Sequence, residues 1–139
     1  MSQSWSCVKG STLLIPSGPN EGHKHLFALM LDPVVVSGRG PKPCVLIACV
    51  TSVKDGIPGE DCCLLGPADH PFILHDSYVD YRFTRLEFAE HVQARIAEGV
   101  FTPKVPCSPE IKKKKIAGAL SSRRINREHK QLLEKVLFG

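Results

Sequence analysis

The sequence changes its hydrophobic periodicity once, near residue 83, and this change constrains the fold more than any other feature. Up to that point the apolar residues form short runs, rich in Val, Ile and Leu, which Pro, Gly and Asp interrupt. Such runs are typical of strands joined by turns. They predict strands over residues 12–15, 26–36, 44–53, 62–65, 72–74 and 78–83. Because the connectors 37–43 and 54–59 are rich in Gly and Pro, we expect a coiled antiparallel sheet that closes as a small barrel.

The last of these predicted strands alternates cleanly between apolar and polar residues. One set of side chains is expected on the apolar face, in the core: Val79, Tyr81 and Phe83. The other set is expected on the polar face: Tyr78, Asp80 and Arg82. This two-residue period is the signature of a strand that buries one side.

A helical period begins after residue 83. Thr84 and Glu87 have the spacing of a capping box, and Gly99 is a suitable C-terminal stop, so we predict a helix over 84–98. Farther on, Ser108 followed by Pro109 predicts the start of a second helix, and Asn126 is a candidate cap for a third. Residues 121–124 leave open whether the last two helices are separate or one bent helix.

These elements predict a mainly β chain with helices, in the α+β class. We expect a single domain over residues 1–139, whose barrel core covers about 8–83 and 99–107 and whose basic C-terminal helices cover 109–138. With 139 residues, 42% of them hydrophobic, the chain can bury one modest core. No apolar run approaches the roughly 18 residues of a membrane-spanning helix, and residues 1–7 lack the basic start and long apolar segment of a secretory signal. We therefore expect a cytoplasmic protein with no membrane segment.

The six cysteines never fall at the two-residue spacing of a zinc knuckle or a thioredoxin-type site. Small buried thiols in a reducing compartment are the expected case. A metal site would have to combine His23 and His25 with a distant cysteine, and we expect neither a metal nor another cofactor.

The positive charge of the chain is concentrated at its C-terminal end. From residue 109 onward there are nine Lys or Arg and three Glu, a net charge of +6, which leaves −2 for residues 1–108 out of the total of +4. Such a block can neutralise phosphates or bind an acidic protein. A solvated outer face on amphipathic helices explains it equally well.

Several short motifs follow one another in a particular order. Gly10 precedes the first predicted strand, a loop contains Gly18-Pro19 and Gly22, the next strand ends in Asp32-Pro33 and the third ends in Thr51-Ser52. A strand containing Ser77-Tyr78-Val79 and a closing basic helix complete the series. In this order the motifs resemble the MazF/PemK (Kid) toxins of bacterial type II toxin–antitoxin systems. The resemblance is best over residues 9–51 and resumes loosely over 70–82 and 98–137, so the predicted helix 84–98 is an insertion relative to the shorter toxins.

The resemblance implies an SH3-like barrel of the CcdB–MazF type that forms a homodimer and acts in the bacterial cytoplasm. It implies an endoribonuclease that cleaves single-stranded RNA without metal and is inhibited by an antitoxin, whose extended segment fills the RNA groove. Thr51 and Ser52 match the position that contacts the scissile phosphate, where their role would be to donate hydrogen bonds to phosphate oxygens. Without the resemblance, a Thr-Ser pair that ends a strand is the simpler interpretation.

The chain departs from the family where the second strand opens. The family commonly has Arg-Pro there, and this chain has Leu26-Phe27. Metal-free RNA cleavage requires a base for the 2′-hydroxyl, an acid for the leaving 5′-oxygen, and a cation for the charge between them. The catalytic candidates are therefore His23 and His25, between which the sequence does not choose, together with Lys24, Thr51, Ser52 and Arg82. The substrate-binding candidates are Tyr78, which could stack on a base, Asp80 and Arg85.

Three functions from different classes remain open. The first is the endoribonuclease toxin. The second is a non-catalytic toxin of the CcdB type that binds a protein target, which the missing Arg favours. The third is a catalytically silent barrel that binds nucleic acid or a partner through its basic helices.

Overall fold

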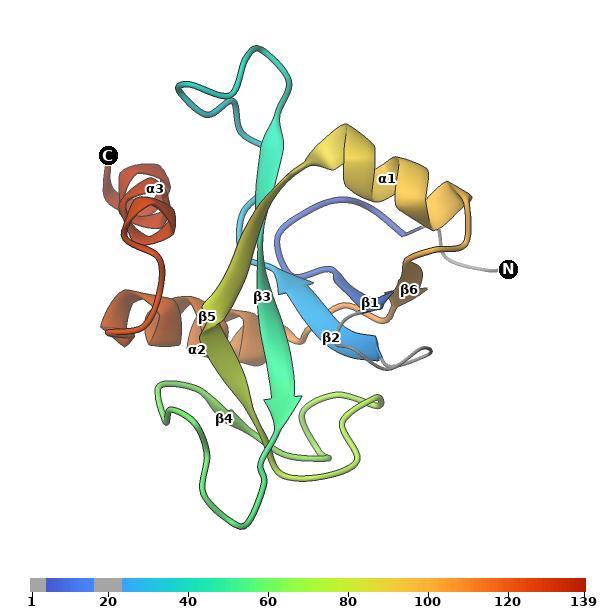
Figure 1. The fold of residues 1–139 in the computed structure, drawn as a ribbon, viewed down its shortest axis with the longest axis vertical. Coiled ribbons are helices and arrows are strands. Elements are labelled where there is room, and N and C mark those ends of the chain that lie inside the picture. Colours follow the sequence, from blue (N-terminus) through green and yellow to red (C-terminus); the bar gives the residue numbers. More distant parts are fainter. Residues whose placement is uncertain (1–4, 17–23) are drawn as a thin grey trace.

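The computed structural model describes residues 5–16 and 24–139, and it shows an α+β fold (Figure 1). Six strands form one sheet: β1 (Thr12–Pro16), β2 (Lys24–Leu29), β3 (Cys44–Ser52), β4 (Leu64–Leu65), β5 (Ser77–Phe88) and β6 (Thr102–Lys104). Three helices complete the fold: α1 (Ala89–Ala97), α2 (Pro109–Ser121) and α3 (Arg127–Phe138). Within the described residues, no helix is long and apolar enough to cross a membrane.

The sheet is antiparallel throughout and strongly curled, so that it forms a half-barrel. Its strand order is β4-β5-β3-β2-β1-β6, which places β4 and β6 at the two edges. The long strands β3 and β5 cross the shorter β1 and β2 at a steep angle in Figure 1, and the connectors 37–43 and 54–59 project at opposite ends of β3. The curl gives the sheet a concave face and a convex face, and both are partly covered.

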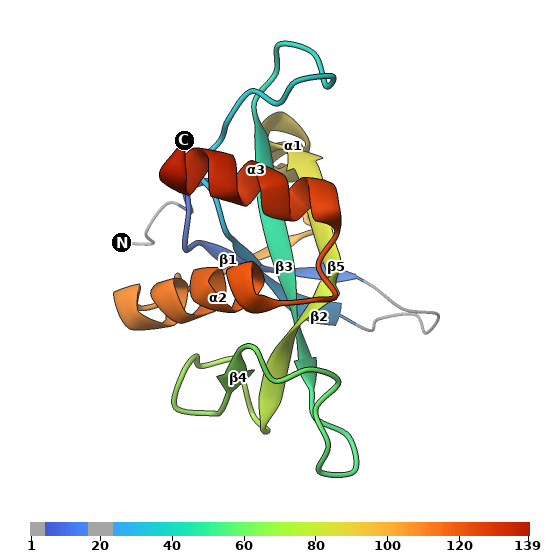
Figure 2. The same cartoon turned by 90° about the vertical axis from the view of Figure 1, so that its left-hand side faces the viewer.

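Side chains from alternate positions of β1, β2 and β3 fill two hydrophobic clusters, one on each face. The cluster against α2 and α3 includes Leu14, Leu26, Leu46, Val50, Ala119 and Leu133. The cluster against α1 and the N-terminal segment includes Leu13, Phe27, Val45, Ile47, Val92 and Phe101. Figure 2 shows α2 and α3 lying across one side of β3 and β5, with α1 behind the sheet. We call the side that faces α1 the inner face.

The predicted strands differ from the structure at three places besides the end of β5, and β6 was not predicted as a strand. The strand predicted over 62–65 is shortened to Leu64–Leu65. The strand predicted over 26–36 ends at Leu29, and its extension is reduced to an isolated bridge between Val34 and Cys44. Residues 72–74 form no strand, because the chain turns there and the Ile73 amide donates to the His70 carbonyl at 3.0 Å. In these places a strand forms only where a neighbouring segment is available to pair with it, and local composition alone does not determine this.

The prediction of a helix over 84–98 is wrong at its N-terminal end. Strand β5 continues to Phe88, and residues 85–88 pair with residues 44–47 of β3. Thr84 is consequently no cap: its hydroxyl bonds to Nδ1 of His129 at 2.7 Å, and α1 begins at Ala89 without a side-chain cap. The C-terminal stop is confirmed, since Gly99 adopts a φ of 78° directly after the helix.

The core position predicted for Phe83 is also wrong, whereas those of Val79 and Tyr81 are confirmed. Asp80 lies opposite Cys49 and Arg85 lies opposite Ile47, so that residues 81–84 form a bulge facing a single residue of β3. The bulge breaks the alternation, and Phe83 is 54% exposed. The main-chain amide of Tyr81 donates instead to the Glu60 carboxylate at 2.7 Å, which keeps the buried backbone group paired.

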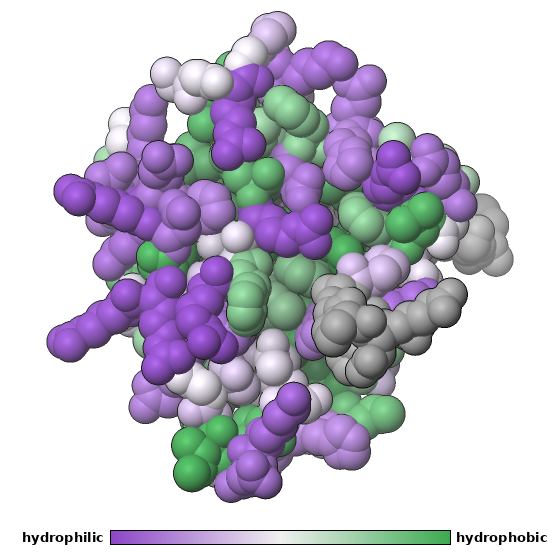
Figure 3. Space-filling view, viewed as in Figure 1, coloured by the Kyte–Doolittle hydropathy of each residue, from purple (hydrophilic) through white to green (hydrophobic). Residues whose placement is uncertain are grey.

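The two C-terminal helices are separate, and their predicted caps are confirmed. The Ser108 hydroxyl accepts from the Ile111 amide at 3.2 Å, and the Asn126 side chain accepts from the amides of Glu128 and His129. Figure 3 shows hydrophilic side chains projecting on the side where α2 and α3 lie. Lys115 is an exception to this solvated face, because it is 2% exposed.

Helix α2 approaches β5 closely at Gly118. The Tyr81 hydroxyl donates to the Lys115 carbonyl at 2.6 Å, and a Cβ built on Gly118 would overlap that hydroxyl and lie 2.8 Å from the Cys62 carbonyl. A glycine is therefore required here for the helix to sit against the sheet.

Gly118→Ala should lower the free energy of unfolding by about 1–3 kcal/mol, the usual cost of overpacking, although alanine favours a helix. Chemical denaturation measures this change. Gly38→Ala is not a suitable control because Gly38 has a positive φ, whereas Ala117→Ser places a similar extra atom on the same helix and should cost less. Equal losses in the two variants would contradict the close approach.

Folding fixes His70 in its neutral form. Its Nδ1 accepts from the Phe72 amide at 3.0 Å, and its Nε2 lies 2.8 Å from the Val105 carbonyl, so Nε2 carries the hydrogen. Burial lowers the pKa of His70 from the ordinary 6.5, and the nearby Lys115 and Lys104 act in the same direction. A second proton would remove the acceptor that the Phe72 amide requires.

The protein should lose stability as the pH falls below about 6.5. A histidine with a depressed pKa in the folded state binds fewer protons than the unfolded chain does, so its contribution is present above pH 6.5 and is lost on acidification. Urea unfolding at pH 7.5 and pH 5.5 measures the difference. His70→Gln should show a smaller difference, and an unchanged one would contradict the assignment. Some dependence should persist, because burial also lowers the pKa of His129.

Candidate functional site

A cavity of about 700 Å³ lies on the inner face of the sheet, beyond the part that α1 covers. Strands β2, β3 and β5 and the loop 54–59 form its walls. Its lining residues are His25, Phe27, Cys49, Thr51, Ser52, Lys54, Ile57, Gly59, Tyr78, Asp80, Arg82, Phe83, Thr84 and Arg85. We call this cavity the groove.

Strand register explains why these residues meet. Thr51 lies directly opposite Tyr78, and Cys49 lies between Asp80 of β5 and Phe27 of β2. Opposed residues of antiparallel strands project from the same face, and residues two apart along a strand share that face. His25 lies two residues before Phe27 on β2 and therefore projects from the same face. The sequence therefore carries these side chains on three strands, and pairing brings them together.

Seven of the nine residues singled out from the sequence line the groove: His25, Thr51, Ser52, Tyr78, Asp80, Arg82 and Arg85. Lys24, at the start of β2, does not. It lines an adjoining cavity of about 320 Å³, which also includes Phe72, Leu74 and His75 and which shares His25, Thr51, Ser52 and Lys54 with the groove. His23 lies outside the described residues.

A buried carboxylate holds one of the groove's cations. Asp80 is 2% exposed, and its two oxygens accept from Nε and Nη2 of Arg82 at 3.0 and 2.8 Å. This bidentate geometry is the strongest form of an ion pair between these groups. The hydrogen bonds and the charge of Asp80 raise the pKa of Arg82. The guanidinium is consequently a fixed cation at the groove, with about half of its side chain in solvent.

The second cation is Arg85, which Glu87 orients on the same strand. Its Nε and Nη2 lie 3.0 and 2.9 Å from Oε1 of Glu87. Each arginine also lies over an aromatic ring, Arg85 at 5.6 Å from the ring centre of Phe27 and Arg82 at 5.1 Å from that of Phe83. Two guanidinium groups and two phenyl rings thus form one wall.

The loop 54–59 covers Tyr78. A Cβ on Gly59 would lie 3.0 Å from Cζ of the Tyr78 ring, which shows how closely the loop and ring approach. Tyr78 is only 7% exposed, so its face is not open for stacking. The exposed apolar side chains at the groove are Ile57 and Phe83, with 76% and 54% exposure.

Sequence reasoning missed Lys54, Ile57 and Phe83. Ile57 and Lys54 lie in the Gly- and Pro-rich connector directly after Thr51-Ser52, and that position was the available signal. Phe83 gave no signal, because its exposure depends on the bulge.

Cys49 also lines the groove, but burial raises the pKa of this thiol to about 11. A thiol in that state is a poor nucleophile at neutral pH. Among the residues that the structure describes, no three His, Cys, Asp or Glu side chains come together as a metal site.

Comparisons of this chain with protein-family models, with curated proteins and with solved structures find no match.

Asp80→Asn should lower the thermal midpoint of unfolding and loosen Arg82, because an amide cannot balance the guanidinium charge at a buried position. Differential scanning calorimetry measures the midpoint. Glu87→Gln is the matched control, since the carboxylate of Glu87 is more exposed than that of Asp80, and it should change stability by less than about 1 kcal/mol. If the two variants are equally stable, Asp80 does not hold Arg82 in the way that its two hydrogen bonds indicate.

Proposed function

We propose that this protein is an endoribonuclease of the MazF/PemK type, which cleaves single-stranded RNA without a metal ion. We further propose that its half-barrel is a form of the SH3-like barrel of CcdB and MazF toxins. The observation that carries the proposal is that one cavity brings together His25, Thr51, Arg82 and Arg85, although the first and the last lie 60 residues apart in the chain.

The groove holds one group for each step of RNA transesterification. In our scheme His25 takes the proton of the 2′-hydroxyl, whose oxygen then attacks the phosphorus. The P–O5′ bond breaks, and Lys54 gives a proton to the leaving oxygen. Arg82 and Arg85 balance the charge that develops on the phosphate, while Thr51 and Ser52 donate hydrogen bonds to its oxygens. The products are a 2′,3′-cyclic phosphate and a free 5′-hydroxyl.

The residues that line the groove favour single-stranded RNA over a duplex. Unpaired bases can stack on exposed rings and on arginine planes, and Phe83 with Arg82 above it offers such a surface at the rim. Lys54, Arg82 and Arg85 supply the positive charge that follows a phosphate backbone.

A second function is favoured by one observation. Ile57 and Phe83 are large apolar side chains that stand exposed beside the groove, as expected of a surface that binds protein. Under this alternative the chain is a CcdB-type toxin that binds a protein target. We propose that the same groove accepts an antitoxin segment and that the protein acts as a homodimer, as the family resemblance implies.

The test is an assay of several single-stranded RNAs in EDTA. The parent should generate 2′,3′-cyclic phosphate ends, and His25→Asn and Arg85→Ala should each lose about 10²- to 10⁴-fold in rate. Lys42→Gln is the charge control, because Lys42 pairs with Glu90 on α1 and lies outside the groove. Lys24→Ala shows whether the adjoining cavity takes part.

Intact RNA with a folded parent would reject the ribonuclease and leave the protein-binding toxin. That alternative predicts growth inhibition that survives His25→Asn but is lost in an Ile57→Asp, Phe83→Asp double variant. Cleavage that survives both His25→Asn and Arg85→Ala would place the chemistry outside the groove.

A further inference from the structure

The amine of a buried lysine and a thiol lie together beyond β1 and β6, away from the groove. Nζ of Lys115 is 3.1 Å from Sγ of Cys107. Lys115 is 2% exposed, although it belongs to a run of four lysines on α2. In the part of the chain that the structure describes, Cys107 is the one hydrogen-bond partner of this amine.

The hydrogen bond gives the pair its chemistry. A polar group removed from water has to be compensated by hydrogen bonds inside the protein. The Cys107 sulfur is the acceptor that the Lys115 amine uses, so the amine is aimed at the atom that would react.

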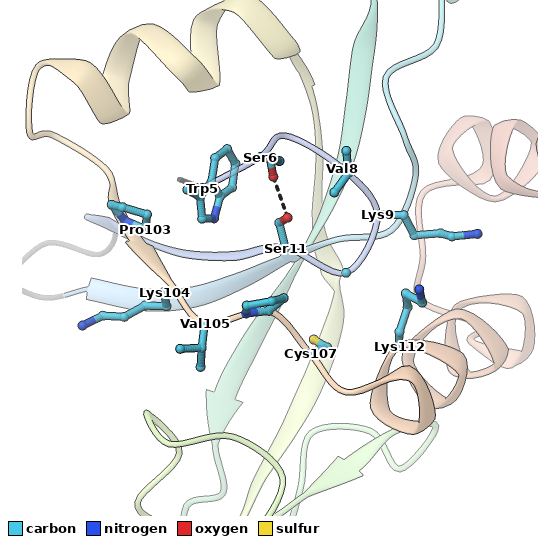
Figure 4. A pocket seen from close by; sticks show the side chains of 12 residues that line it. Trp5, Ser6, Val8, Lys9, Ser11, Pro103, Lys104, Val105, Cys107 and Lys112 are labelled. Carbon is cyan, nitrogen blue, oxygen red and sulfur yellow. Dashed lines mark hydrogen bonds between the residues drawn. The ribbon is translucent and has the colours of Figure 1, made fainter. Parts of the chain in front are cut away.

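Cys107 is held in place and remains reachable. Its main-chain amide donates to the Gly10 carbonyl at 2.8 Å, which fixes the backbone, and its side chain is only partly buried. It lines a cavity of about 730 Å³ between the N-terminal segment, β6 and the start of α2. Figure 4 shows Cys107 between Val105 and Lys112, with Trp5 and Pro103 across the cavity.

The cavity combines cations with an aromatic ring. Three lysines contribute to its lining, each from a different segment of the chain: Lys9, Lys104 and Lys112. The amine of Lys104 points away from the cavity in Figure 4 and lies 5.8 Å from the centre of the Phe72 ring, so Lys112, which follows Cys107 on α2, is the cation tested below. The Trp5 indole is fixed by a 2.8 Å hydrogen bond from its Nε1 to the Thr12 carbonyl. A ligand with carboxylates and a short organic body fits these groups, because the carboxylates can pair with ammonium groups while the body packs on the ring and prolines.

The other five cysteines lack these features. Burial raises the pKa of the thiols of Cys7, Cys44, Cys49, Cys62 and Cys63. Among them only Cys62 is partly exposed, and its neighbours Glu60 and Asp61 raise its pKa further. Cys62 is therefore an internal control of similar exposure and opposite electrostatics.

We propose that Cys107 is a modification site that exchanges with small anionic disulfides, of which oxidised glutathione is the probe. The Cys107 sulfur attacks one sulfur of the disulfide, and the disulfide's S–S bond breaks as a new S–S bond forms to Cys107. The departing sulfur takes the bonding electron pair and the proton that the Cys107 thiol gives up. One disulfide and one thiol thus give one mixed disulfide and one thiol, with no further oxidant.

The test follows adduct formation on the full-length folded protein with oxidised glutathione, located by peptide mass mapping. Cys107 should be modified first, about tenfold faster than Cys62. Lys115→Met keeps an apolar stem in the buried site and should slow modification of Cys107. Circular dichroism confirms the fold of each variant.

A second comparison tests the lysine-lined cavity even if Lys115→Met fails to fold. Lys112→Gln should slow the reaction with oxidised glutathione but not that with the neutral 2-hydroxyethyl disulfide. Lys113→Gln removes the same charge from the next position of α2, which does not line the cavity, and should change neither rate. The proposal is overturned if Cys62 reacts as fast as Cys107, or if Lys112→Gln and Lys113→Gln behave alike.

Discussion

The pairing of β3 with β5 is the interaction on which the rest of the structure depends. It contains the largest number of paired positions in the sheet, from Ser52 opposite Ser77 to Cys44 opposite Phe88. The bulge at residues 81–84 divides this ladder into two parts, and the extra residues bend β5 so that the sheet curls. Both parts turn charged side chains toward the groove, Asp80 from one and Arg85 from the other. The curl and the site therefore have the same structural origin.

The bulge leaves a buried main-chain amide of β5 without a partner in the sheet, and another segment supplies the acceptor. The Tyr81 amide leaves the ladder, and Glu60 accepts its hydrogen bond while also accepting one from the Ser122 hydroxyl at the end of α2. The Tyr81 side chain extends in the other direction to the Lys115 carbonyl. One irregular residue of β5 thus fixes a loop and a helix, and the same helix carries the lysine that pairs with Cys107.

The sequence predicted correctly those helix ends that depend only on neighbouring residues. The caps at Ser108 and Asn126 and the stop at Gly99 each depend on a few neighbouring residues, and each was predicted correctly. Thr84 and Glu87 form an equally good local signal, yet residues 84–88 are strand because four cross-strand pairs with β3 outweigh one capping box. No pattern within the chain marks Phe83 as exposed or Lys115 as buried, because both follow from the bulge and from the helix that packs beside it. The grouping at the groove was predicted from the resemblance, and strand register supplies its physical reason.

Under the proposed ribonuclease function, the lack of an arginine at Leu26-Phe27 has a geometric explanation. A phosphate responds to where a positive charge lies in space and not to which strand carries it. Phe27 of β2 and Arg85 of β5 stand on either side of β3, and the guanidinium reaches back over the phenyl ring. A cation on β5 therefore occupies the region above β2 that a β2 arginine would serve. The aromatic residue at position 27 then acts as the platform that holds this cation, which makes Phe27 part of the proposed site.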